Sequence, residues 1–159
     1  MQTVYIETTI PSLYFDDRAN PSTVARREWT RNWWDGERQK YRLLTGVPVI
    51  EELSRSEHPR KTEKLQLLNE VQLLLVNSTV TEIIEVYIRR YVMPKDPVGD
   101  AAHLALASYH KCDFLLTWNC QHLANANKFG HIRTVNALLG LPVPQIVTPL
   151  QLLGESYET

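Results

Sequence analysis

Three carboxylates and one carboxamide stand where they could do chemistry together. Glu7 ends the stretch "VYIE", Glu52 lies within "VIEEL", Asp100 begins "DAAHLALA", and Asn119 ends "LLTWN". Carboxylates that are brought close together repel one another, which raises their pKa values and costs stability. A hard cation such as Mg²⁺ or Mn²⁺ removes that cost, and it can activate water and neutralise charge on a phosphoryl oxygen. We therefore predict that the three carboxylates bind metal, directly or through water, and that Asn119 holds a metal-bound water.

Two of the neighbouring acids also have an ordinary structural explanation. Glu51 and Glu52 lie in the first turns of an expected helix, where the helix dipole alone favours acids. Because they are adjacent, their side chains point about 100° apart, so only one of them is expected to face a site. We choose Glu52, which precedes the apolar Leu53, and we expect Glu51 to be solvated.

The two aspartates around Pro97 are expected to differ in role. Asp96 is fully explained as a helix cap, because Pro97 suits the first helical position. Asp100 lies one turn further in, immediately before the apolar "AAHLALA". There the positive end of the helix would keep the carboxylate ionised and ready for a cation. We expect Asp96 to be structural and Asp100 to be functional.

Threonines and histidines could support these acids. Thr8 and Thr117 adjoin Glu7 and the Asn119 turn, so we expect their hydroxyls to orient carboxylates rather than to be ordinary strand-end groups. His103 follows Asp100 by three residues, but no second histidine stands at a spacing that completes a zinc site. We expect it to be a hydrogen-bonded packing residue.

Short apolar runs alternate with helical patterns along the chain. The expected strands cover 4–7, 42–44, 113–118 and 145–149, and residues 72–76 fit either a strand or the end of a helix. The expected helices begin at Asn20-Pro21, Thr45, His58-Pro59, 81 and Asp96-Pro97, and a last one contains "VNALLG". Strands separated by helices predict an α/β fold with a mostly parallel sheet covered on both faces. Ligands bind beyond the carboxyl ends of such strands, where the candidate residues lie.

The totals favour one ordinary globular domain spanning 1–159. A net charge of −1 argues against non-specific binding driven by overall charge. The two cysteines, Cys112 and Cys120, lack the spacing of a disulfide framework or a zinc site, and we expect reduced thiols. No apolar run approaches the roughly 18 residues that span a membrane, so we predict a cytoplasmic protein with no membrane partner.

One expected helix, within residues 21–41, is basic and interleaved with aromatic residues. Nucleic acids are bound by arginine at phosphates and by aromatic rings stacked on bases. We expect its arginines to contact phosphates and most of its tryptophans to pack on the core or on another subunit. The residues concerned are Arg26, Arg27 and Arg31, with Trp29, Trp33 and Trp34 between and after them.

The motifs "VYIETT", "VIEEL", "DAAHLALA" and "LLTWN" occur in the order seen in PIN-domain ribonucleases. The chain resembles their VapC-like branch, the toxin halves of bacterial toxin–antitoxin pairs, from Val4 to about Leu153. The resemblance implies a compact PIN-like α/β/α sandwich with a central mostly parallel sheet. It also implies Mg²⁺- or Mn²⁺-dependent RNA cleavage that leaves a 5′-phosphate, and a homodimer neutralised by an antitoxin.

The resemblance also assigns the site residues by position. Glu7 takes the place of the family's first aspartate, and Glu52 matches the glutamate after the second strand. Asp100 matches the central aspartate, while Asn119 falls where many members have another aspartate. Glu7 is one methylene longer than the usual residue, and Asn119 lowers the negative charge of the site.

Two functional hypotheses follow from these residues. The first is a metal-dependent endoribonuclease, with Glu7, Glu52, Asp100 and Asn119 as the catalytic set. The second is a catalytically weakened PIN-like module that binds RNA or protein, which the residues at 7 and 119 favour. A phosphatase of the haloacid-dehalogenase type is disfavoured, because it needs an Asp-x-Asp motif after the first strand and "IETT" lacks it.

Overall fold

The computed structural model describes residues 1–55, 57–93 and 98–154, and its core is a five-stranded parallel sheet. The strand order is β3-β2-β1-β4-β5, and every neighbouring pair is parallel. The predicted α/β class is thus confirmed, and residues 72–76 contribute a strand rather than the end of a helix. The strands are β1 (Thr3–Ile6), β2 (Arg42–Gly46), β3 (Gln72–Leu74), β4 (Phe114–Leu116) and β5 (Gln145–Val147).

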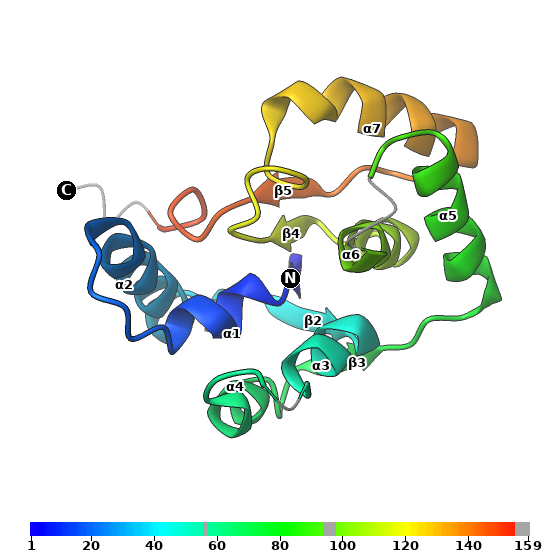
Figure 1. Ribbon diagram of the computed structural model, residues 1–159. Helices are drawn as coiled ribbons and strands as arrows, with labels where there is room; N and C mark the ends of the chain where they lie inside the picture. The colour runs from blue at the N-terminus through cyan, green and yellow to red at the C-terminus, as the bar shows by residue number, and fades with distance from the viewer. Residues whose placement is uncertain (56, 94–97, 155–159) are drawn as a thin grey trace.

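Helices cover both faces of this sheet, as a PIN-like α/β/α sandwich requires. Helix α2 lies on one side, and α6 lies on the other with α5 behind it (Figure 1). The helices are α1 (Thr9–Tyr14), α2 (Pro21–Gly36), α3 (Val47–Leu53), α4 (Lys61–Leu67), α5 (Ser78–Arg89), α6 (Val98–Tyr109) and α7 (Ala126–Leu139), with a 3₁₀ turn η1 (Arg38–Lys40). In the part of the chain that is described, no helix is long and apolar enough to cross a membrane.

The central strand β1 explains why a carboxylate can follow an apolar run. Val4, Tyr5 and Ile6 are fully buried, because β1 pairs with β2 on one side and β4 on the other. The backbone N–H of Glu7 still donates to the carbonyl of Leu116 at 3.2 Å. Glu7 therefore leaves the sheet at its middle, at the carboxyl edge, and not at an exposed margin.

The expected helix starts at Asn20-Pro21, Thr45 and Asp96-Pro97 have different outcomes. Asn20 caps α2 as predicted, since its side chain accepts from Thr23 N at 2.9 Å and Pro21 follows it. The prediction that Thr45 caps the next helix is wrong. Thr45 belongs to β2, where its hydroxyl donates to the carbonyl of Ile6 at 2.8 Å. The cap of Asp96 lies outside the described residues.

The strand-to-helix connection after β2 depends on a glycine. A Cβ on Gly46 would lie 2.5 Å from Leu106 Cδ1 and 2.5 Å from the Tyr5 hydroxyl oxygen. Real Cβ atoms do not approach other atoms so closely, so only glycine lets α6 pack this near to β1 and β2. The close approach brings the first turn of α6 to the carboxyl edge of the sheet.

A buried polar cluster joins α5, α6 and α7. The Tyr87 hydroxyl donates to Asn136 Oδ1 at 2.6 Å, and Asn136 Nδ2 donates to Ser108 Oγ at 3.0 Å. All three residues are buried. Because water cannot replace a lost partner there, each hydrogen bond stabilises the packing of these helices on one another.

We expect Tyr87→Phe to lower the free energy of unfolding by about 1–3 kcal/mol, because Asn136 Oδ1 would lose its donor in a buried place. Urea unfolding measures the change. Tyr91→Phe is the matched control, since Tyr91 is 87% exposed and should lose less than about 0.5 kcal/mol. Equal midpoints for the two variants would contradict the structural role of the Tyr87 hydroxyl.

Candidate functional site

One cavity at the carboxyl edge of the sheet contains all four residues singled out in the sequence. It has a volume of about 1000 Å³, and Glu7, Glu52, Asp100 and Asn119 line it. They come from the end of β1, from α3, from the first turn of α6 and from the turn after β4. The structure thus brings these four residues together, while their catalytic roles stay a prediction.

Glu7 is held by hydroxyl groups on both sides. Its Oε1 accepts from Thr117 Oγ1 at 2.8 Å, from Thr9 N at 3.0 Å and from Thr9 Oγ1. Burial raises the pKa of Glu7, and the positive field of His103 and these hydrogen bonds oppose the rise. None of the hydrogen bonds among the described residues uses Oε2, so that oxygen is available toward the cavity. Thr117 orients a carboxylate as expected, and Thr9 does so as well.

Glu52 is held by a threonine and a histidine. Its Oε2 accepts from Thr8 Oγ1, and its Oε1 lies 3.2 Å from His103 Nε2. The other ring nitrogen, Nδ1, lies 2.9 Å from the Tyr5 hydroxyl. Burial raises the pKa of Glu52, but the hydrogen bond and charge of His103 outweigh it and hold the pKa below its usual value.

His103 lies centrally among the acids and is only 1% exposed. Burial alone would lower its pKa, but the hydrogen bond that His103 donates to Glu52 and the negative charges of Glu7, Glu52 and Asp100 raise it. The sequence predicts a packing residue here, and the structure adds that the surrounding acids favour the protonated form of its imidazole. The signal in the sequence is its spacing of three residues from Asp100 on the same helix.

Asp100 has one satisfied oxygen and one unsatisfied oxygen. Oδ1 accepts from Asn119 Nδ2 at 3.0 Å, whereas Oδ2 is buried and finds no hydrogen-bond partner in the described part of the chain. Burial raises the pKa of Asp100, against the opposing charges of His103 and His122. A buried carboxylate oxygen without a partner is costly, and it is the kind of atom that a cation would satisfy.

Asn119 acts here through its nitrogen. Its Oδ1 accepts from the backbone N–H groups of Gln121 at 3.2 Å and His122 at 3.0 Å, which builds the turn after β4. The sequence assigns the oxygen of Asn119 to a metal-bound water, but two backbone donors already occupy it. The Asn119 amide therefore positions Asp100. The hydrogen bonds of its nitrogen and of its oxygen fix the orientation of the amide.

Gly99 is a site residue that sequence reasoning missed. A Cβ on Gly99 would lie 2.2 Å from Glu52 Oε1. A side chain at this position would therefore displace the Glu52 carboxylate from the place that it has here. A glycine at this point of a helix gives no pattern of its own in one sequence, so only the packing shows its role.

The donor chemistry of the cavity fits Mg²⁺ or Mn²⁺ in part. Oxygen donors predominate, and Asp100 Oδ2 lacks a partner. However, among the described residues no group of three or more His, Cys, Asp or Glu side chains is arranged to hold a metal ion. Mg²⁺ often uses only one or two carboxylates and keeps several waters, so the site suits such a cation and does not form a closed protein cage.

The predicted RNA-binding arginines lie outside the cavity. Arg27 Nη1 donates to the carbonyl of Asp16 at 2.7 Å, and Arg31 Nε donates to that of Tyr14 at 2.9 Å. Both guanidinium groups thus hold the chain around α1. Arg26 is exposed and lies over the ring of Trp118 at 5.6 Å.

The tryptophans of α2 pack inward, as expected for most of them. Trp33 and Trp34 are buried in the core, and Trp29 stacks on Trp118 with ring centres 6.1 Å apart. Trp118 is itself anchored by a hydrogen bond from Nε1 to Thr30 Oγ1 at 2.7 Å. Since Asn119 follows Trp118, this packing helps to fix the turn at the cavity.

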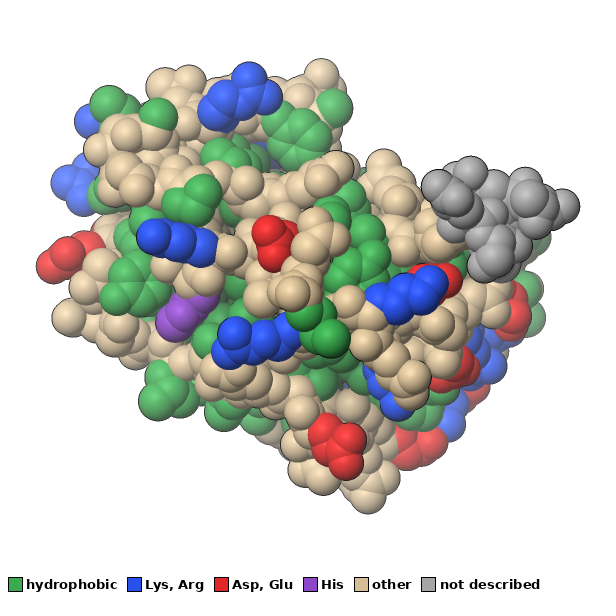
Figure 2. All heavy atoms as spheres, turned by 180° about the vertical axis from the view of Figure 1, so that it is seen from behind, with side chains coloured by type: hydrophobic (Ala, Val, Ile, Leu, Met, Phe, Trp, Pro, Cys, Tyr) green, Lys and Arg blue, Asp and Glu red, His purple; other side chains and the backbone are tan. Residues whose placement is uncertain are grey.

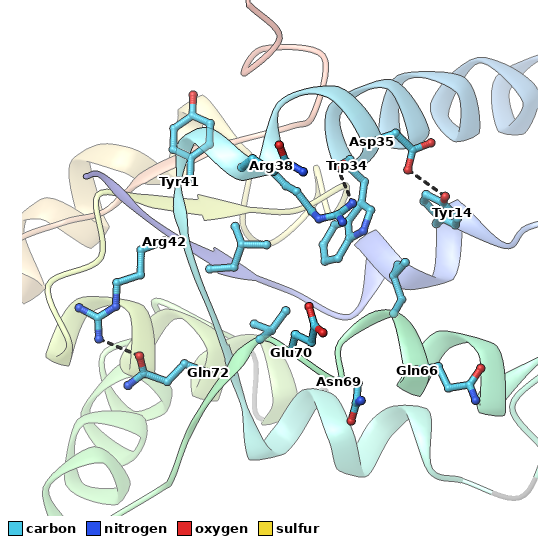
Figure 3. Close-up of a pocket in the computed structure, with 14 residues that line it drawn as sticks. Tyr14, Trp34, Asp35, Arg38, Tyr41, Arg42, Gln66, Asn69, Glu70 and Gln72 are labelled. Atoms are coloured by element: carbon cyan, nitrogen blue, oxygen red, sulfur yellow. Dashed lines mark hydrogen bonds between the residues drawn. The ribbon is translucent and has the colours of Figure 1, made fainter.

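A second cavity, of about 660 Å³, lies between the end of α2, the start of β2 and the segment before β3 (Figure 3). Arg38, Arg42 and Glu70 line it, and a hydrogen bond of 3.0 Å joins Tyr14 to Asp35 at its margin. None of the four candidate residues lines it. We therefore place the candidate active site in the first cavity.

Solved structures share this fold at low sequence identity. Comparison with protein-family models finds no match, and comparison with curated protein sequences finds none. The VapBC2 structure from Rickettsia felis, bound to a promoter DNA fragment, matches with a TM-score of 0.59 and 12% identity, over 92% of this chain and 98% of that chain. FitAcB from Neisseria gonorrhoeae matches with 0.55 and 15%, over 94% and 99%.

A third structure has a stated activity. VapC20 from Mycobacterium tuberculosis, described as a toxin that cleaves the sarcin–ricin loop, matches with a TM-score of 0.53 and 14% identity, over 70% of this chain and 86% of that chain. At these identities the likeness shows the fold. The chain therefore has the VapC-like PIN-domain fold that its sequence motifs predict.

The raised pKa of Asp100 leads to a prediction about stability without metal. A carboxyl whose pKa is higher in the folded state is destabilising when ionised, and this cost is present at pH values above both pKa values and vanishes below the unfolded value of about 3.8. We expect Asp100→Asn in EDTA to raise the Tm near pH 7.5. Relief of about 1 kcal/mol corresponds to about 2–4 °C for a domain of this size.

A pH series of melting curves measures this effect. The gain should shrink as the pH falls and be absent near pH 3.5, where wild-type Asp100 is protonated in both states. Glu82→Gln is the control for the melting curves, because Glu82 is exposed on α5 and makes no side-chain hydrogen bond or ion pair among the described residues. A Tm that falls in Asp100→Asn at pH 7.5 would contradict the described environment.

Proposed function

We propose that the protein is a metal-dependent endoribonuclease and the toxin of a toxin–antitoxin pair. The observation that carries the proposal is that Asp100, which lines the same cavity as Glu7 and Glu52, has a buried Oδ2 with no hydrogen-bond partner among the described residues. The VapC-like PIN-domain fold supports it, since VapC20, which shares this fold, is an RNA-cleaving toxin.

Each residue of the site would have a distinct part in the reaction. Asp100 would hold the cation through Oδ2, with Glu7 and Glu52 contributing directly or through water. When bound, Mg²⁺ or Mn²⁺ would supply activation of the attacking water and neutralisation of negative charge on the phosphate. Asn119 fixes the rotamer of Asp100 through a 3.0 Å hydrogen bond. Thr117 and Thr9 fix Glu7 in the same way.

As a toxin, the protein would be neutralised by a protein partner, the antitoxin. Toxins of the VapC-like branch, which the sequence resembles, are neutralised by an antitoxin, and we extend this to the present chain together with a homodimeric assembly.

The charged side chains of the surface do not form one large face for binding nucleic acid. On the face that Figure 2 shows, basic and acidic side chains are interspersed, and neither sign forms a continuous patch.

A second candidate function is a weakened PIN-like module that binds RNA or protein. The arrangement of the acids favours it, because Glu52 already accepts from Thr8 and contacts His103, and no three-acid metal group exists among the described residues. The two functions differ in whether the cavity binds a cation, so metal binding separates them.

We expect purified protein to cleave RNA in Mn²⁺ and leave 5′-phosphate ends, and EDTA to abolish cleavage. Asp100→Asn should reduce the rate by about 100-fold or more, because the charge stabilisation that a metal supplies is worth several kcal/mol. Incubation with total RNA and mapping of the ends measures this. Asp113→Asn is the control and should cleave as wild type does; cleavage that persists in both EDTA and Asp100→Asn would refute the mechanism.

We expect Mn²⁺ to bind wild type and to raise its Tm, because a ligand that binds only the folded state adds about 2.7 kcal/mol at a concentration 100 times its Kd. Calorimetry and melting curves at millimolar Mn²⁺ measure both effects. Asp100→Asn should show neither. Wild type without metal-dependent heat and with an unchanged Tm would instead support the binding module.

A further inference from the structure

A third cavity, which we call the basic cavity, lies beside the one that contains Glu7, Glu52 and Asp100, which we call the acidic cavity. It has a volume of about 610 Å³ and is bounded by the end of α1, the loop before α2 and the start of α4. Ser12, His58 and Pro59 line both cavities, so they form a shared wall. The two cavities therefore lie next to each other, on either side of these three residues.

Most of the charges in the basic cavity neutralise one another. Arg18 pairs with Asp16 at 2.7 Å, and Arg60 pairs with Asp17 at 2.9 Å and Glu63 at 2.6 Å. These pairs also fix the loop, because Arg60 Nη1 reaches the carbonyl of Phe15 at 3.2 Å. Among the lining residues, two arginines and two aspartates cancel, and Glu63, which lies outside the lining, adds one more negative charge. These pairs therefore give the cavity its shape and no positive sign.

Lys64 is the third cation that lines the cavity. It is only 4% exposed, and no ion pair of the described residues includes it. A lysine normally carries its ammonium to water even when its stem is buried. Asp16 and Asp17 act on Lys64 through space, but both are already engaged by arginines. Burial lowers the pKa of Lys64, which is the cost that a bound anion would relieve.

The hydrogen bond between Lys64 and His58 determines which of their N–H groups remain for a ligand. Its Nζ lies 3.3 Å from His58 Nδ1. An ammonium can only donate, so Nδ1 accepts, and the neutral ring then carries its proton on Nε2. The pair therefore offers the remaining N–H groups of Lys64 and the Nε2–H of His58 at the wall between the two cavities. Arg55 adds an exposed positive charge on the acidic side.

We propose that Lys64 and His58 form a second phosphate site that binds a neighbouring phosphodiester of the RNA strand whose scissile phosphate lies at Glu7, Glu52 and Asp100. This inference rests on the proposed function and adds the path of the substrate. Lys64 suits a phosphate because it is buried, positively charged and in no ion pair of the described residues, and the neutral ring of His58 adds an N–H donor beside it. The site reads no base, so it contributes affinity and position for any sequence.

The test is the salt dependence of RNA binding in EDTA, where cleavage cannot occur. A fluorescein-labelled, mixed-sequence, single-stranded oligoribonucleotide is the probe, and anisotropy gives Kd over a series of salt concentrations. Each phosphate contact to a single strand contributes about 0.7 to the slope of log K against log salt. We expect Lys64→Met, which keeps the buried stem, to lower the slope by about 0.7 and to weaken binding about fivefold at 0.1 M salt.

Lys111→Met is the matched control, because Lys111 is exposed between α6 and β4, at the opposite edge of the sheet. Its slope and Kd should equal those of wild type. A second measurement on wild type does not depend on the folding of a variant. One uncharged methylphosphonate is moved along the oligoribonucleotide, and we expect a single position next to the cleavage point to lose about fivefold. That loss should disappear in Lys64→Met.

The outcomes separate this proposal from the proposed function. An unchanged slope in Lys64→Met, a methylphosphonate penalty that persists in that variant, or no RNA binding by wild type would each overturn the phosphate site. The Mn²⁺ cleavage assay judges the nuclease independently. If the salt slope of RNA binding depends on Lys64 but the protein never cleaves RNA, the phosphate site is supported and the nuclease is refuted. If the protein cleaves RNA but Lys64→Met leaves the salt slope unchanged, the nuclease is supported and the phosphate site is refuted.

Discussion

The structure depends on burying negative charge at one edge of a parallel sheet. Glu7 and Asp100 are 3% and 6% exposed, and burial raises the pKa of each. A fold tolerates such groups only if positive charge or hydrogen-bond donors meet them. Here the donors are threonine hydroxyls and the Asn119 amide, and the charge comes from His103. The arrangement around β1 follows from this requirement.

Close packing by small residues is what allows these groups to meet. Gly46 lets α6 approach the strands, and Gly99 lets the start of α6 approach Glu52. The helix then carries both Asp100 and His103 into the same region. A Cβ at Gly46 or Gly99 would force neighbouring side chains to move, so both glycines favour the observed position of α6. The charged groups therefore converge even though they repel one another.

The sequence was sufficient for the parts of the site that follow from topology. Parallel strands end at a common edge, so Glu7 and Asn119 could be placed from hydrophobic runs alone, and Asp100 from its position at a helix start. It was insufficient where the outcome depends on which atom faces which neighbour. The oxygen of Asn119 is taken by backbone N–H groups, and Thr45 serves a strand and not a helix cap. The roles of His103 and Lys64 likewise depend on contacts with residues far apart in the sequence.

The two adjoining cavities differ in what they require before they can accept a phosphate. The acidic cavity repels an anion until a cation enters it, whereas the basic cavity contains Lys64, a cation that belongs to no ion pair of the described residues. Under the proposed function, we therefore expect RNA binding and metal binding to be separable steps. The separation also explains how a nuclease and a binding module can arise from the same chain. Loss of the cation would leave the strand-binding part intact, because Lys64 and His58 make no contact with Glu7, Glu52 or Asp100 among the hydrogen bonds and ion pairs of the described residues.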